Sequence, residues 1–79
     1  MAGESLHNTL RVYRAVRDLT QAELAVRSGM TRKSVNAIEA GRMVPSIYLA
    51  LKLARVLEVS VDALFSLDDT SEPPSREAR

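Results

Sequence analysis

The chain has 79 residues, which is enough for one domain and too few for two. Hydrophobic residues make up 46% of it and charged residues 27%, which indicates a folded domain and excludes a disordered chain. It contains no cysteine, so disulfides and thiolate metal sites are excluded. A domain of this size has a small hydrophobic core, so its stability depends on helix packing and self-association. No apolar run approaches the ~18 residues of a membrane span, and the first residues lack the features of a signal peptide. We therefore expect a cytoplasmic protein without membrane contact.

The formal net charge of +1 hides an uneven distribution. Residues 1–65 hold nine Lys and Arg against six Asp and Glu, which gives +3, whereas residues 66–79 hold two against four, which gives −2. The larger part of the chain is therefore mildly basic and its end mildly acidic. A basic folded part is compatible with a nucleic-acid partner, provided that the charges gather on one face.

The hydrophobic pattern predicts an all-α domain of five short helices over residues 6–67. The hairpin dipeptides Asn-Gly and Asp-Gly do not occur in the sequence, and no sustained alternation of apolar and polar residues indicates a strand. The first helix is expected over residues 6–17, because Leu6, Leu10 and Tyr13 recur at helical spacing on one face.

Two further helices are predicted close together in the next segment. Thr20 and Glu23 have the spacing of a capping box, which favours a helix over residues 21–28 that Gly29 ends. Thr31 is an N-cap for a third helix over residues 32–40, which Gly41 follows. Two helices of about this length, joined by a short turn that contains glycine, are typical of a helix-turn-helix, here residues 21–40.

The rest of the chain is predicted to hold two more helices and a tail. A fourth helix is expected over residues 47–57, and its apolar residues cover most of its circumference, so we expect it to be the central, most buried helix. A short fifth helix is expected over residues 61–65. Residues 68–79 are polar and acidic and are expected to form a disordered tail.

Several segments in one register resemble the Cro/CI-type helix-turn-helix family, which includes phage repressors and many bacterial regulators of the xenobiotic-response-element group. The matching segments are residues 19–25 (LTQAELA), 29–31 (GMT), 38–41 (IEAG), 45–46 (PS), 50–54 (ALKLA) and 59–65 (VSVDALF). The resemblance implies a five-helix, lambda-repressor-like fold whose third helix enters the major groove of DNA.

The third helix carries hydrogen-bonding side chains that suit this role. Arg or Lys can pair with guanine and Asn with adenine, so Arg32, Lys33 and Asn36 are predicted to read base edges. The predicted contacts to the DNA backbone are Gln21, Thr31, Ser34 and Arg42, of which the resemblance implies Gln21 and Arg42.

The resemblance also implies a structural ion pair between Arg14 of the first helix and Glu39 of the third. The sequence departs from the family pattern at two positions. Glu58 stands where the family commonly has glycine, so the chain there either adopts a left-handed conformation at a cost of roughly 1 kcal/mol or ends the helix differently. Ala40 replaces a residue that is often polar in the family.

These features predict a sequence-specific, double-stranded-DNA-binding transcriptional regulator, with repression of a palindromic operator as a homodimer as the expected activity. A dimer doubles the DNA contacts and spaces its two third helices about 34 Å apart. The expected dimer interface consists of apolar residues near the end of the domain: Val59, Val61, Leu64, Phe65 and Leu67. The alternative is a protein-interaction module with a protein partner, such as the antitoxin of a toxin–antitoxin pair.

Catalysis is not expected from this sequence. Five small helices with one histidine and no cysteine leave little room for a cleft with converging titratable groups. His7 stands alone near the N-terminus and is expected to be a surface residue, so no metal or other cofactor is predicted.

Overall fold

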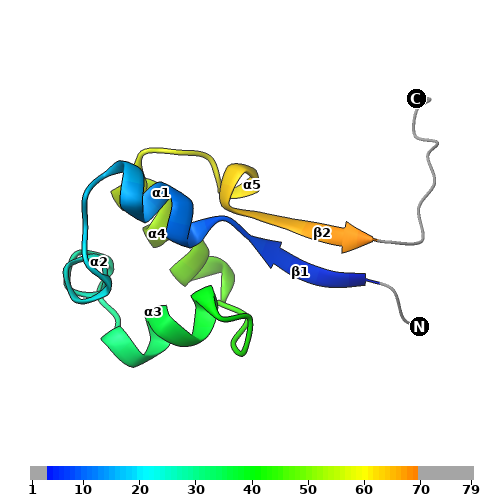
Figure 1. The fold of residues 1–79 in the computed structure, drawn as a ribbon, viewed down its shortest axis with the longest axis horizontal. Coiled ribbons are helices and arrows are strands. Elements are labelled where there is room, and N and C mark those ends of the chain that lie inside the picture. The colour runs from blue at the N-terminus through cyan, green and yellow to red at the C-terminus, as the bar shows by residue number, and fades with distance from the viewer. Residues whose placement is uncertain (1–3, 70–79) are drawn as a thin grey trace.

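The computed structural model describes residues 4–69, which form five helices and a two-stranded antiparallel sheet (Figure 1). The helices are α1 (Leu10–Val16), α2 (Gln21–Ser28), α3 (Arg32–Glu39), α4 (Ile47–Leu57) and α5 (Val61–Leu64), and the strands are β1 (Glu4–Asn8) and β2 (Phe65–Asp69). The five predicted helices and the lambda-repressor-like class of fold are confirmed. Within residues 4–69 no helix is both long and apolar enough to cross a membrane. The disordered tail predicted from residue 68 onward lies outside the described residues, except that β2 extends to Asp69.

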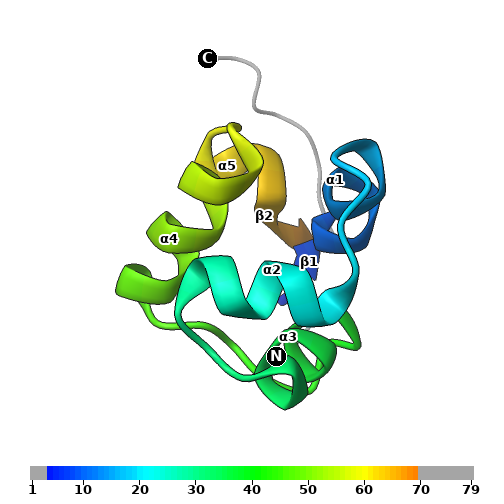
Figure 2. The same ribbon diagram turned by 90° about the vertical axis from the view of Figure 1, so that its left-hand side faces the viewer.

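The core lies between the helices and consists of aliphatic side chains from all five of them. The apolar side chains that are at most 1% exposed are Leu10, Leu24, Val35, Ile38, Leu53, Leu57 and Leu64. Figure 2 shows α2 lying between α3 below and α4 above, so that α2 packs against both. Because every helix contributes to one small core, the orientation of α3 depends on the packing of the whole domain.

Local capping interactions fix the limits of α2 and α3. The Thr20 hydroxyl accepts a hydrogen bond from the Glu23 amide at 3.0 Å, and the Glu23 carboxylate accepts one from the Thr20 amide at 2.8 Å. Gly29 ends α2 in the left-handed conformation, with φ of 72°. The Thr31 hydroxyl caps α3, which ends at Glu39, one residue before the predicted end. The capping box, the glycine stop and the cap at Thr31 are therefore confirmed.

The helix α4 has the predicted limits and contributes more buried residues than any other helix of the structure, but its apolar residues are not buried around the whole circumference. Ala50, Leu53 and Leu57 face the core, whereas Ile47 and Tyr48 are 80% and 67% exposed. These outer side chains stay exposed because no element within residues 4–69 packs on that side of α4. At its end, Glu58 adopts the left-handed conformation, with φ of 60° and ψ of 43°, which is the first of the two predicted alternatives.

Both ends of the described chain differ from the prediction. The first helix begins at Leu10 and not at Leu6, and the expectation that the chain has no strands was wrong, because β1 pairs with β2. The Asn8 side chain accepts a hydrogen bond from the Leu10 amide and donates one to the Ile38 carbonyl, which ends the strand and starts the helix. The Thr9 amide donates a hydrogen bond to the Leu64 carbonyl at 2.9 Å, so the end of β1 and the start of β2 lie side by side where the two-stranded ribbon β1–β2 leaves the helices.

Candidate DNA-binding interface

The outer face of α3 is polar and its inner face is apolar. Val35 and Ile38 are buried against α2 and the core, whereas Arg32, Lys33 and Asn36 are exposed. The three residues predicted to read bases therefore share the open side of one helix. A helix of this size fits the major groove of B-DNA, and these side-chain types match base edges there.

Thr31 and Ser34 form a small hydrogen-bonded turn at the start of α3. The Thr31 hydroxyl accepts from the Ser34 amide and donates to the Ser34 hydroxyl, each at 3.0 Å. Ser34 is half-buried and Thr31 is exposed. The Thr31 hydroxyl thus uses its one donor and one of its acceptor lone pairs within the turn. The turn therefore holds the first residues of α3 in a fixed conformation, and this does not depend on a contact between either hydroxyl and phosphate.

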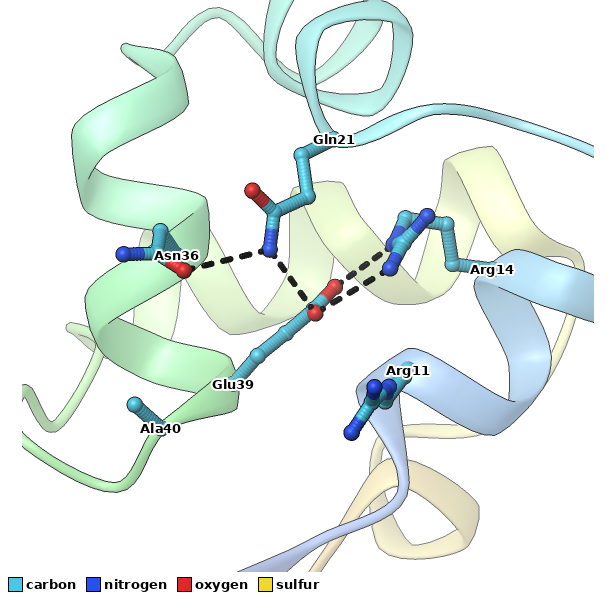
Figure 3. A pocket seen from close by; sticks show the side chains of 6 residues that line it. All are labelled: Arg11, Arg14, Gln21, Asn36, Glu39 and Ala40. Carbon is cyan, nitrogen blue, oxygen red and sulfur yellow. Dashed lines mark hydrogen bonds and ion pairs between the residues drawn. The ribbon is translucent and has the colours of Figure 1, made fainter.

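A polar network lies directly beneath α3 and joins it to α1 and α2 (Figure 3). The Arg14 guanidinium meets the Glu39 carboxylate in two places, with Nε 2.7 Å from Oε2 and Nη2 3.3 Å from Oε1. A third guanidinium nitrogen, Nη1, donates to the Leu19 carbonyl at 2.9 Å. The side chains are only 18% exposed for Arg14 and 7% for Glu39. The ion pair that the resemblance implied is thus present. A bidentate pair of this kind fixes the relative orientation of the two side chains in addition to stabilising them electrostatically.

Gln21, the first residue of α2, connects this network to the outer face of α3. Its amide nitrogen donates to Glu39 Oε1 at 3.1 Å and to Asn36 Oδ1 at 3.3 Å. In Figure 3 the Asn36 amide nitrogen points away from Gln21. A residue predicted to contact the DNA backbone therefore orients one predicted to read a base, so the two helices of the motif act as one unit.

Arg11 lies beside this network and was not among the predicted site residues. It is exposed on α1 and lines the same hollow as Gln21, Asn36 and Ala40 (Figure 3). A signal for it was available, because Arg11 stands three residues before Arg14 and so shares its side of a helix. Arg11 adds a positive charge at the edge of α3 where Ala40 supplies no polar side chain.

Arg42 is exposed in the turn that follows α3. Gly41 adopts a left-handed conformation, with φ of 79°, and the Arg42 amide then donates to the Ala37 carbonyl at 2.8 Å. These two features reverse the direction of the chain at the end of α3, and the exposed Arg42 side chain lies past the last turn of this helix. Exposed arginines, Arg32 and Arg42, thus lie at both ends of α3.

The predicted dimer residues do not form one exposed surface. Leu64 is 1% exposed and belongs to the core of its own domain, so its place in an interface was a wrong prediction. It is buried because α5 folds back against α4 and directs Leu64 inward. Val59, Val61 and Phe65 are partly buried against the same core, and Leu67 alone of the set is largely exposed, at 65%.

His7 lies exposed on β1, as expected. Among the side chains that the structure describes, no group of three or more His, Cys, Asp or Glu comes together to hold a metal ion.

The fold and its exposed polar helix define a helix-turn-helix domain. The chain belongs to the Helix-turn-helix family of Cro/CI type, whose family model matches residues 10–64. An HTH-type transcriptional regulator of Methanocaldococcus jannaschii is 39% identical over 64 residues, which cover 81% of this chain and 97% of that protein. One of Methanothermobacter thermautotrophicus is 40% identical over 65 residues, which cover 81% and 94%.

A solved structure supports the same assignment. The restriction-modification controller protein C.AhdI of Aeromonas hydrophila superposes with a TM-score of 0.66 at 35% identity, over 68% of this chain and 82% of that chain. The protein is therefore a DNA-binding transcriptional regulator of the helix-turn-helix class and not an enzyme.

Proposed function

We propose that the protein is a repressor that binds a palindromic operator as a homodimer and reads bases with Arg32, Lys33 and Asn36. The observation that carries this proposal is the two-sided character of α3, which buries Val35 and Ile38 and leaves those three side chains open. A repressor needs no further activity than occupancy of a promoter, and a short helix-turn-helix domain supplies that.

The remaining polar residues of the interface position the domain on the DNA backbone. Arg42 and Arg11 both lie near the end of α3 and are proposed to contact phosphates at the edge of the groove. Gln21, Thr31 and Ser34 lie at the starts of α2 and α3, where free backbone amides and the positive end of the helix dipole also favour phosphate. Phosphate contacts fix the register of the protein but carry no sequence information.

Two single variants test this division of roles. Arg32→Ala is expected to reduce discrimination between the operator and a variant with one base changed by about 1–3 kcal/mol, because a bidentate base contact is lost. Arg42→Ala is expected to weaken binding to all sequences alike and to lower the salt dependence by about one phosphate contact. Binding is measured by fluorescence anisotropy over a salt series, on an operator selected from genomic fragments by the wild-type protein.

The matched control is Arg55→Ala, which removes an exposed arginine from α4, outside the α3 face and its flanking turn. It is expected to leave both discrimination and salt dependence near the wild-type values. If Arg32→Ala and Arg42→Ala lowered affinity equally on every sequence, the assignment of Arg32 to base reading would be wrong.

A further inference from the structure

The β1–β2 ribbon carries an apolar face that nothing in the described chain covers. Its register places Leu6 directly opposite Leu67, and Asn8 opposite Phe65. Side chains alternate along a strand, so Leu67 and Phe65 share the face of Leu6, and Ser66 and His7 share the other. Phe65 packs on the core, whereas Leu6 and Leu67 are 36% and 65% exposed. The apolar face therefore starts in the core and continues outward beyond the helices.

A two-stranded ribbon of this kind lacks stability by itself. Each strand has five residues, and isolated two-stranded sheets are at best marginally stable in water without a further layer or strand. Within residues 4–69, the tertiary hydrogen bonds that anchor the ribbon lie at its base, where Asn8 and Thr9 donate to the Ile38, Ala63 and Leu64 carbonyls. The leucine pair beyond that base gains stability only if something packs on it.

Another exposed apolar surface, which holds three large side chains close together, is the outer side of α4 with Ile47, Tyr48 and Leu51. Lys52 and Arg55 border it, and Lys52 Nζ lies 5.8 Å from the centre of the Tyr48 ring. In a symmetric contact between two copies, the same patch is used twice, so two lysines and two arginines would be brought into one small interface. Like charges brought together at an interface oppose association. The α4 surface, with two cations beside its apolar centre, is therefore less suited to a second copy than the leucine pair. The charged positions on the leucine face, Glu4 opposite Asp69, lie at the outer end of the ribbon.

We propose that two copies of the chain associate through the face of the β1–β2 ribbon that carries Leu6 and Leu67. This inference deepens the proposed homodimeric function and rests on it. In Figure 1 the ribbon extends to one end of the longest axis, while α3 begins near the other end. Packing of two ribbons about a two-fold axis thus buries four leucines at the centre of the dimer and leaves both recognition helices open to DNA.

The alternation of the strand supplies a matched pair of variants. Leu67→Glu places a carboxylate on the apolar face, and Ser66→Glu places one on the opposite face of the same strand. Sedimentation equilibrium is expected to show that Leu67→Glu weakens dimerisation by about 100-fold, because each dimer loses two buried leucines and gains two charges. Ser66→Glu and Leu51→Glu, on α4, are expected to dimerise like the wild type.

A second substitution separates association from folding. Leu67→Ala removes the side chain without adding charge and is expected to weaken the dimer by about tenfold, with the circular dichroism of the folded protein retained. A wild-type chain that stays monomeric at tens of micromolar, or a dimer disrupted by Leu51→Glu and not by Leu67→Glu, would overturn the ribbon interface.

Half-site binding distinguishes this inference from the proposed function. Monomeric Leu67→Glu is expected to bind a single half-site with the wild-type affinity and to lose the added affinity for the full palindrome. A wild-type protein that binds no DNA contradicts the proposed function, while the sedimentation result still decides the dimer surface.

Discussion

Two arginines in the first helical segment, Arg14 and Arg17, each meet a carboxylate from another part of the chain, in very different surroundings. Arg14 forms a bidentate pair with Glu39, the last residue of α3, and both side chains are largely buried. Arg17 Nη2 lies 3.5 Å from Glu58 Oε1 at the surface, where the side chains are 40% and 71% exposed.

The difference shows what each pair contributes. Glu39 has three donors, from Arg14 and Gln21, so removal of its carboxylate leaves a guanidinium buried without its counter-charge. The surface pair is hydrated and screened, and such pairs contribute about 0–1 kcal/mol. At Glu58 the backbone conformation matters more than the charge, because φ is positive there. Three predictions test this contrast, each at a different carboxylate.

The largest effect is expected at Glu39. Glu39→Ala should lower the free energy of unfolding by about 3–5 kcal/mol, because one partner of a buried ion pair is removed and the other remains. Urea denaturation followed by circular dichroism measures the loss. Glu39→Gln is the conservative comparison, since it keeps one acceptor for Arg14. A loss below about 1 kcal/mol for Glu39→Ala would place this pair with the surface pairs.

The second prediction has the opposite sign. Glu58→Gly is expected to raise the free energy of unfolding by about 1 kcal/mol, because glycine adopts the left-handed conformation without the steric cost that other residues incur. Glu58→Ala is the control, since it removes the same carboxylate but keeps the strained backbone, and it should be neutral or slightly destabilising. Equal stabilisation by both variants would locate the effect in the charge and not in the backbone.

The smallest effect is expected at Glu23 and depends on pH. Hydrogen bonds from the Thr20 amide and hydroxyl lower the pKa of Glu23 from its usual 4.5. A group whose pKa falls on folding stabilises the protein above its unfolded pKa and loses that contribution as the pH drops through the folded value. The stability advantage of the wild type over Glu23→Gln should therefore be present above about pH 4.5 and shrink below it.

Thermal unfolding of both proteins from pH 6 to pH 3 measures this difference. The control is the same comparison in a Thr20→Ala background, which removes the hydroxyl of the capping box. There the pH-dependent part should become smaller. An advantage that stays constant down to pH 3 would show that the ionised carboxylate plays no part in the cap.

The helix-turn-helix could be predicted from the sequence because its signals are local. Thr20, Glu23 and Gly29 act within one or two turns of the helices that they limit, and Thr31 does the same for α3. A hydrogen bond between residues three apart in the chain depends little on the rest of the fold. The candidate recognition residues followed from the same local pattern, since a buried stripe at Val35 and Ile38 implies which side of α3 is open.

Other features could not be predicted because they depend on residues far apart in the chain. The ribbon pairs Leu6 with Leu67, but β1 shows no alternation of apolar and polar residues, and in β2 the alternation covers only residues 65–68, too few to identify a strand alone. Leu64 looked like a candidate interface residue, yet it enters the core of its own domain. Hydrophobic character alone does not distinguish a residue that packs within its domain from one that packs on a partner.

The sequence by itself determined the family, the limits of α2 and α4, and the residues on the open side of α3, because caps, glycine stops and helical periodicity act over a few residues. The tertiary structure decided how Gln21 joins Glu39 to Asn36, that Arg11 lies beside α3, and that β1 and β2 pair as a ribbon with a leucine face. Those features depend on segments that only the packing of the core brings together.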